Sequence, residues 1–210
     1  MRITETEELS KSRSRVWIDG EPAFVLYKGE LRAYHINAGE EIAEEDYRTI
    51  LEEVLPKRAK LRAMNLLTKR EYTEKQLYDK LKSGGYPEEV IRTALDYVAS
   101  FRYTDDLRYA VSYISDHETS RSRRRIEQDL LGKGIGRQTL EQAFDEWEAR
   151  GGSQDEQAMI RALLRKRNYD PDTADFQERQ KTYAFLMRKG FSGEAVGRAL
   201  RFEESGEESC

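Results

Sequence analysis

Three stretches of this chain share one outline, and this internal repeat limits the fold more than any other feature of the sequence. In each stretch a leucine is followed four residues later by a glycine, and the glycine by a large apolar residue. A further apolar residue comes five positions later, then an alanine and another large apolar residue at helical spacing. The copies run from Leu81 to Leu95, from Leu130 to Phe144 and from Leu186 to Leu200.

The glycine of each copy predicts where a helix stops and the chain reverses. A helix end commonly needs a residue in the left-handed conformation, which glycine adopts without steric cost. The predicted structural turns are therefore Gly85, Gly134 and Gly190. The apolar residue after each of them should fold back onto the helix just ended; these residues are Tyr86, Ile135 and Phe191.

The period of the repeat predicts the fold class. The glycines lie about 50 residues apart, which is longer than the two-helix repeats of about 34 residues and fits three helices per unit. Only 38% of the 210 residues are hydrophobic and 36% are charged, a composition that suits shallow cores between neighbouring repeats. We therefore expect a mainly α protein, with three tandem three-helix repeats in an elongated, curved array.

The beginning of the chain differs from the repeats. Residues 1–15 are polar and are predicted to be disordered. Val16–Ile18 and Phe24–Tyr27 flank Asp19-Gly20, which predicts a β-hairpin with Pro22 confining the second strand to an edge. Residues 29–36 fit a short helix or a third strand equally well.

The predicted domains follow from these patterns. Residues 16–56 form a hairpin and helix extension, in which Pro56 interrupts a helix that starts near Ile42. Thr73 is expected to cap a helix of the first repeat, and Gly151-Gly152-Ser153 to link the second repeat to the third. The repeats are assigned to residues 57–102, 103–150 and 151–202, and residues 203–210 to an acidic tail.

Neither a cofactor nor a metal ion is expected. The single cysteine, Cys210, provides no thiolate set, and His35 and His117 have no partners at ligand spacing. The first residues contain no apolar run, so we expect no signal peptide and no membrane helix, and a cytoplasmic protein.

The sequence contains no catalytic constellation, so we expect no enzyme. Residues 132–136, Gly-Lys-Gly-Ile-Gly, resemble a phosphate loop only superficially, because they follow a helix and lack the terminal Gly-Lys-Ser/Thr. Asp105 and Asp106 precede an apolar-periodic run, where capping of a helix explains them better than a metal site or an acid pair.

Charge is distributed unevenly along the chain. The net charge is −4, but residues 1–55, 56–137 and 138–210 carry −6, +6 and −4. Within the basic middle part, four arginines occur in five residues: Arg121, Arg123, Arg124 and Arg125. Crowding of like charges is unfavourable unless a partner compensates it, so this cluster is the predicted interaction site, with a plain solvated helix face as the alternative.

As an ordered set, the motifs resemble the RecX family of bacterial regulatory proteins over about residues 57–202. The first repeat contributes Ala63, Leu66-Leu67, Arg70, Leu77, Lys80-Leu81 and Gly85-Tyr86. The second contributes Thr104-Asp105-Asp106, Tyr109-Ala110, Tyr113, Arg125-Ile126, Leu130 and Lys133-Gly134-Ile135. The third contributes Arg179-Gln180-Lys181, Phe185-Leu186, Arg188-Lys189-Gly190-Phe191-Ser192 and Val196. Gly84 departs from the pattern, because the other copies have Lys133 and Lys189 at this position.

The resemblance implies a regulator that binds the RecA recombinase, in particular its filament on single-stranded DNA, and restrains recombination and SOS-linked activity. We expect the protein to be a monomer. The resemblance implies no catalysis, and binding to single-stranded DNA alone should be weak because the chain is acidic overall. An independent helical-repeat nucleic-acid binder is the alternative. The residues expected to bind RecA or DNA are Arg121, Arg123, Arg124, Arg125, Lys133, Lys181, Arg188 and Lys189.

Overall fold

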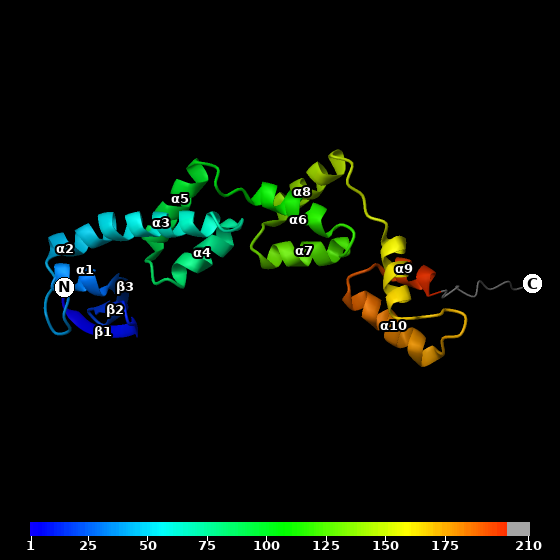
Figure 1. The fold of residues 1–210 in the computed structure, drawn as a ribbon, viewed down its shortest axis with the longest axis horizontal. Helices are drawn as coiled ribbons and strands as arrows, with labels where there is room; N and C mark the ends of the chain where they lie inside the picture. Colours follow the sequence, from blue (N-terminus) through cyan, green and yellow to red (C-terminus); the bar gives the residue numbers. More distant parts are fainter. Residues whose placement is uncertain (201–210) are drawn as a thin grey trace, which may run out of the picture. The chain divides into compact units, whose positions relative to one another are not determined.

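A computed structural model describes residues 1–200 of the chain, and their contacts divide it into two compact units, Met1–Asp105 and Asp106–Cys210. The predicted fold class is confirmed, because each repeat consists of three helices (Figure 1). The acidic tail at 203–210, including Cys210, lies outside the described residues. No helix within residues 1–200 is both long enough and apolar enough to cross a membrane.

The first unit begins with a three-stranded antiparallel sheet in the order β1 (Ile3–Ser10), β2 (Arg13–Ile18) and β3 (Glu21–Tyr27). The predicted hairpin is present as β2 and β3. Its turn has positive φ at both Asp19 (51°) and Gly20 (89°), as a tight reversal matched to the strand twist requires. β3 lies at the edge of the sheet, and the register shifts next to Pro22, which has no backbone N–H to donate.

The prediction of a disordered start at residues 1–15 is wrong, because β1 occupies most of this segment. Only Ile3 of β1 is fully buried, so the strand lacks the alternating apolar pattern that identifies strands in a sequence. Pairing with β2 stabilises it, and Glu7 and Glu8 form ion pairs with Arg15 (2.9 Å) and Lys28 (3.0 Å).

The prediction that Pro56 interrupts the preceding helix is also wrong. Of the two alternatives for residues 29–36, the structure has the short helix, α1 (Lys28–Ala33). Further along, the chain is helical without a break through α2 (Glu44–Thr49), η1 (Ile50–Val54) and α3 (Leu55–Leu67), and Pro56 lies inside this run. The η1 segment is a π-helical turn, in which the N–H of Leu55 donates to the carbonyl of Ile50. This wider turn accommodates a proline whose ring would clash in a regular α-helix interior.

The first repeat consists of α3, α4 (Glu74–Lys82) and α5 (Glu88–Ser100), with α3 and α5 packed together. The Thr73 hydroxyl accepts from the N–H of Gln76 (3.2 Å), which confirms the predicted cap. The sheet and this repeat share one hydrophobic core. The two lie close together at Gly85, where a Cβ would lie 2.2 Å from the Cγ2 of Val25.

The second unit contains the other two repeats, each with its own core. The second repeat consists of α6 (Asp106–His117), α7 (Arg123–Gly132) and α8 (Arg137–Ala149). The third consists of α9 (Glu156–Lys166), α10 (Phe176–Arg188) and α11 (Gly193–Ala199). The predicted linker at 151–153 is followed by Gln154, whose side-chain amide donates to the carbonyls of Glu118 (2.7 Å) and Arg121 (2.8 Å).

The predicted glycine turns are confirmed: φ is +81° at Gly85, +90° at Gly134 and +87° at Gly190. The residue after the second and third of these glycines folds back as expected. The N–H of Ile135 donates to the carbonyl of Leu130 (3.1 Å), and that of Phe191 to the carbonyl of Leu186 (3.4 Å). This bond and the one from the glycine itself make the Schellman motif, which satisfies the last carbonyls of a helix.

Candidate functional site

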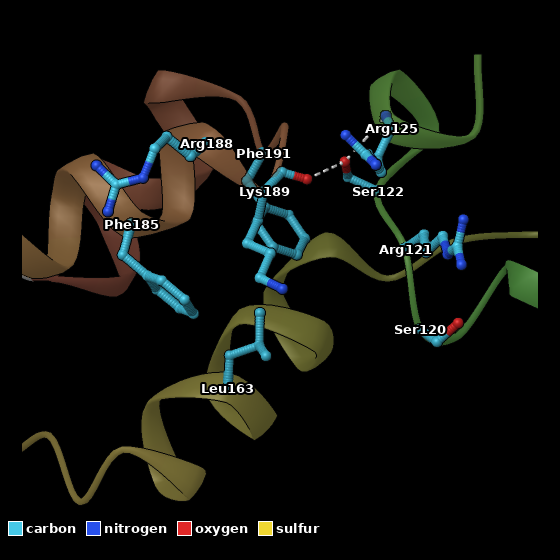
Figure 2. Close-up of a pocket in the computed structure, with 9 residues that line it drawn as sticks. All are labelled: Ser120, Arg121, Ser122, Arg125, Leu163, Phe185, Arg188, Lys189 and Phe191. Atoms are coloured by element: carbon cyan, nitrogen blue, oxygen red, sulfur yellow. Dashed lines mark hydrogen bonds between the residues drawn. The ribbon is translucent and has the colours of Figure 1, made fainter. Parts of the chain in front are cut away.

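A basic cavity of about 700 Å³ lies where the second repeat meets the third, within the second unit. Figure 2 shows its lining, which comes from the segment before α7, from α7 itself, from α9 and from the end of α10. We call it the C-terminal cavity. It is lined by Ser120, Arg121, Ser122, Arg125, Leu163, Phe185, Arg188, Lys189 and Phe191.

Ser122 joins the two repeats at this cavity. It is 1% exposed and is the N-cap of α7, where its hydroxyl oxygen accepts from the N–H of Arg125 (3.3 Å). The same hydroxyl donates to the carbonyl of Lys189 in the third repeat (2.8 Å), the bond drawn in Figure 2. Gly190 follows directly, and a Cβ there would lie 2.7 Å from the Ser122 hydroxyl. The turn at Gly190 thus ends α10 and also contacts Ser122 at the start of α7.

Two of the cavity's arginines are paired within the second repeat. Asp129, whose side chain is 15% exposed, forms ion pairs with Arg121 and with Arg125 (3.2 Å). Arg121 also donates to the hydroxyl of Tyr113 (2.6 Å). Burial, and then the charge of Asp129, raise the pKa of the Tyr113 phenol. These arginines are held in place and their charge is partly neutralised.

The cations from α10 are different. Arg188 and Lys189 are exposed, and neither has a carboxylate partner within the described residues. The Lys189 ammonium lies 5.6 Å from the centre of the Phe185 ring, and the guanidinium of Arg167 lies 4.5 Å from the same ring. Positive charge on an aromatic surface, with no internal counter-ion, is arranged to receive an external anion.

The remaining predicted site residues lie apart from the cavity lining. Arg123 points to α8, where it pairs with Glu148 (2.7 Å) and lies 4.1 Å from the centre of the Phe144 ring. Arg124 is exposed, and Lys133, at the other end of α7, lies 5.1 Å from the centre of the Tyr113 ring. Lys181 is exposed on α10, two turns before Arg188. The structure therefore brings together four of the eight predicted residues.

Sequence reasoning missed the aromatic and apolar half of the cavity, namely Phe185, Phe191 and Leu163. It also missed Arg167, although the run Arg165-Lys166-Arg167 is a visible basic signal. Phe185 belongs to the repeat pattern, but its closeness to Arg167 and Lys189 depends on tertiary structure, because Arg167 stands at the end of α9 and Phe185 on α10. Among residues 1–200, no group of three or more His, Cys, Asp or Glu side chains is placed to hold a metal ion.

The fold and the cavity define a class of protein: a tandem three-helix-repeat protein with a basic surface cavity between repeats. Profiles of the RecX family match all three repeats, its first three-helix domain at residues 59–97, its second at 105–143 and its third at 154–200. The chain belongs to the RecX family.

Relatives and solved structures agree with this assignment. The regulatory protein RecX of Caldanaerobacter subterraneus subsp. tengcongensis is 33% identical over 200 residues, which cover 95% of this chain and 96% of that protein. The regulatory protein RecX of Vibrio campbellii is 32% identical over 143 residues, covering 68% and 89%. A crystal structure of regulatory protein RecX superposes with a TM-score of 0.58 at 25% identity, covering 96% of this chain and 99% of that one. The RecX structure from Lactobacillus salivarius shares the fold, with a TM-score of 0.54, 21% identity and coverage of 70% and 96%.

Proposed function

We propose that this protein binds the RecA recombinase, in particular its filament on single-stranded DNA, and inhibits recombination, DNA-dependent ATPase activity and SOS-linked activity. Family membership and the implied role of the family support the partner. The C-terminal cavity is the proposed binding site, because its Arg188 and Lys189 are exposed and have no carboxylate partners in the described chain. Acidic side chains on RecA would supply the missing counter-charges.

The protein acts as a monomeric regulator in the cytoplasm and catalyses no reaction. Docking has two parts. In the first part, Arg121 and Arg125 line one side of the cavity and are held in position by their ion pairs with Asp129. Arg188 and Lys189 provide the free charge, and Phe185 provides apolar contact area. A net charge of −4 makes strong binding to bare DNA unfavourable, so protein contact is the leading mode.

Independent binding to nucleic acid is the second candidate function. It is favoured by Phe185, whose ring lies near both Arg167 and Lys189, because aromatic rings beside cations are typical of single-strand binding surfaces. The two candidates differ in salt dependence. Each phosphate contact to a single strand contributes a slope of about 0.7 in log affinity against log salt, whereas protein docking has no such fixed dependence.

The test uses the double variant Arg188→Ser/Lys189→Ser. Arg121, Arg123 and Arg125 are less suitable, since all three form ion pairs inside the repeat. The matched control is Arg165→Ser/Lys166→Ser, which removes the same charge from exposed positions of the same repeat outside the cavity lining. We expect the first variant to fold normally and to lose suppression of the RecA ATPase, and the control to keep it. A cavity variant that suppresses RecA at the parental concentration would contradict the proposal.

A further inference from the structure

A second basic pocket, of about 470 Å³, lies in the first unit between the sheet and the first repeat. We call it the N-terminal pocket. Its charged residues come from three elements: Arg13 from β2, Arg58 and Arg62 from α3, and Lys80 from α4. No residue of the C-terminal cavity contributes to it.

Arg58 forms the floor of this pocket and is held rigidly. Its side chain is 18% exposed, donates to the carbonyl of Val25 in β3 and pairs with Glu30 (2.6 Å). The guanidinium lies 4.8 Å from the centre of the Tyr27 ring and 5.4 Å from that of Tyr86. Its buried Nε–H has no hydrogen-bond partner in the described chain. This atom is covered by protein, so only the exposed part of the guanidinium can meet a ligand in the pocket.

The other cations of the pocket have no internal counter-ions. Arg13, Arg62 and Lys80 are exposed, and none has a carboxylate partner within residues 1–200. Residues 1–105 contain 18 Lys and Arg and 20 Asp and Glu, so the unit as a whole carries −2. Four of these 18 cations line the N-terminal pocket, and they raise the local electrostatic potential in a unit that is acidic as a whole.

The N-terminal pocket repeats the architecture of the C-terminal cavity. In both, a preceding element abuts the glycine turn between the second and third helices of a repeat: Ser122 at Gly190 in one, Val25 at Gly85 in the other. The departure at Gly84 fits this arrangement. A Cβ there would lie 3.0 Å from the Leu81 carbonyl oxygen and 3.1 Å from the Tyr86 ring, and this ring flanks Arg58.

We propose that the N-terminal pocket binds the phosphate backbone of single-stranded nucleic acid. Three elements direct cations toward one concave site, as repeated phosphate contacts require. Tyr27, a residue that is 43% exposed and lies beside Arg58, offers a surface on which a base stacks. The site adds a nucleic-acid contact to the proposed function, and its main readout, binding to a bare oligonucleotide, does not involve RecA, so the two proposals fail separately.

The experiment measures binding of a fluorescein-labelled oligothymidylate to the full chain by anisotropy, from low to physiological salt. The pocket variant is Arg62→Ser/Lys80→Ser, and the matched control is Arg92→Ser/Lys11→Ser, which removes one arginine and one lysine from exposed positions outside the pocket lining. We expect the pocket variant to bind about tenfold more weakly, with a salt slope smaller by about 1.4, because two phosphate contacts are lost. The control should bind like the parent protein.

Four results would overturn the proposal. In the first, the parent protein does not bind the oligonucleotide even at low salt. In the second, the pocket variant and the control lose binding equally, which would show that binding depends on the overall charge of the protein and not on the pocket. In the third, the pocket variant keeps the parental salt slope and loses suppression of the RecA ATPase, which makes the pocket a protein-docking surface. Inorganic phosphate serves as the competitor: if it displaces the strand at equal phosphate concentration, the site recognises a free anion and not a strand.

Discussion

The hydroxyl of Ser122 donates to the backbone carbonyl of Lys189, 67 residues later, and accepts from the N–H of Arg125. One buried side chain therefore caps α7 and also joins the second repeat to the third. The bond uses the carbonyl of the residue just before Gly190, where the left-handed turn brings the backbone close to Ser122. Ser122 and Lys189 both line the C-terminal cavity, so this bond joins its two sides.

Replacement of Ser122 by Ala should reduce the free energy of unfolding by about 1–3 kcal/mol. The change removes an N-cap and leaves a backbone carbonyl without its partner. Chemical denaturation measures the loss. Ser112→Ala, at an exposed position of α6, is the control and should change stability by less than about 0.5 kcal/mol. Equal stability of both variants would show that the bond between repeats contributes nothing.

Gly85→Ala should destabilise the protein more than Gly20→Ala. Both glycines have φ above +80°, and a non-glycine residue in this conformation costs about 1 kcal/mol. A Cβ at Gly20 meets no atom within 4 Å, whereas one at Gly85 would overlap the Cγ2 of Val25. We expect an additional loss of about 1–3 kcal/mol at Gly85.

A second substitution tests the cause of this difference. Val25→Ala removes the Cγ2 that a Cβ at Gly85 would overlap at 2.2 Å and leaves only the Val25 Cβ at 3.0 Å, so the two changes together should destabilise less than the sum of the single changes. Additive effects in a double-mutant cycle would rule out the proposed clash.

Asp129→Asn should lower stability and strengthen anion binding. Asp129 is the shared partner of Arg121 and Arg125, so the neutral amide leaves two cations without a counter-charge. We expect a loss of about 1–3 kcal/mol in the free energy of unfolding. Association with RecA filaments should become tighter, chiefly at low salt. Weaker association in a folded Asp129→Asn variant would show that the C-terminal cavity does not attract negative charge.

Tyr169→Phe should not destabilise the protein at neutral pH, and should make it more resistant to alkali. The buried Tyr169 hydroxyl has no hydrogen-bond partner among the described residues, and burial raises the pKa of the phenol. A raised folded-state pKa contributes stability that is intact below the unfolded pKa of about 10 and is lost as pH rises through the folded value. Urea unfolding between neutral pH and pH 11 measures the difference. A variant that loses stability with alkali as steeply as the parent protein would contradict this account.

Local signals determined the repeats. Leucine and glycine at fixed spacing specify where a helix ends, because left-handed backbone after a helix depends on the residue itself. Gly85, Gly134 and Gly190 were therefore identifiable as turns from the sequence, and so was the Thr73 cap. The hairpin was also local, since Asp19-Gly20 favours one turn type. The elongated, curved arrangement of the repeats stays a prediction.

Contacts between elements decided the rest. β1 has almost no apolar pattern and becomes a strand only because β2 offers it backbone partners. Pro56 continues a helix because a π-turn removes the clash that the sequence predicts. The arginine cluster was visible as four like charges. Two of their ion pairs are local, because Arg123 and Arg125 each have an acidic residue one helical turn later, Glu127 and Asp129. The pairs of Arg123 with Glu148 and of Arg121 with Asp129 join separate segments, so only the tertiary structure decided them, because a charge is compensated by whatever lies within a few ångströms in space.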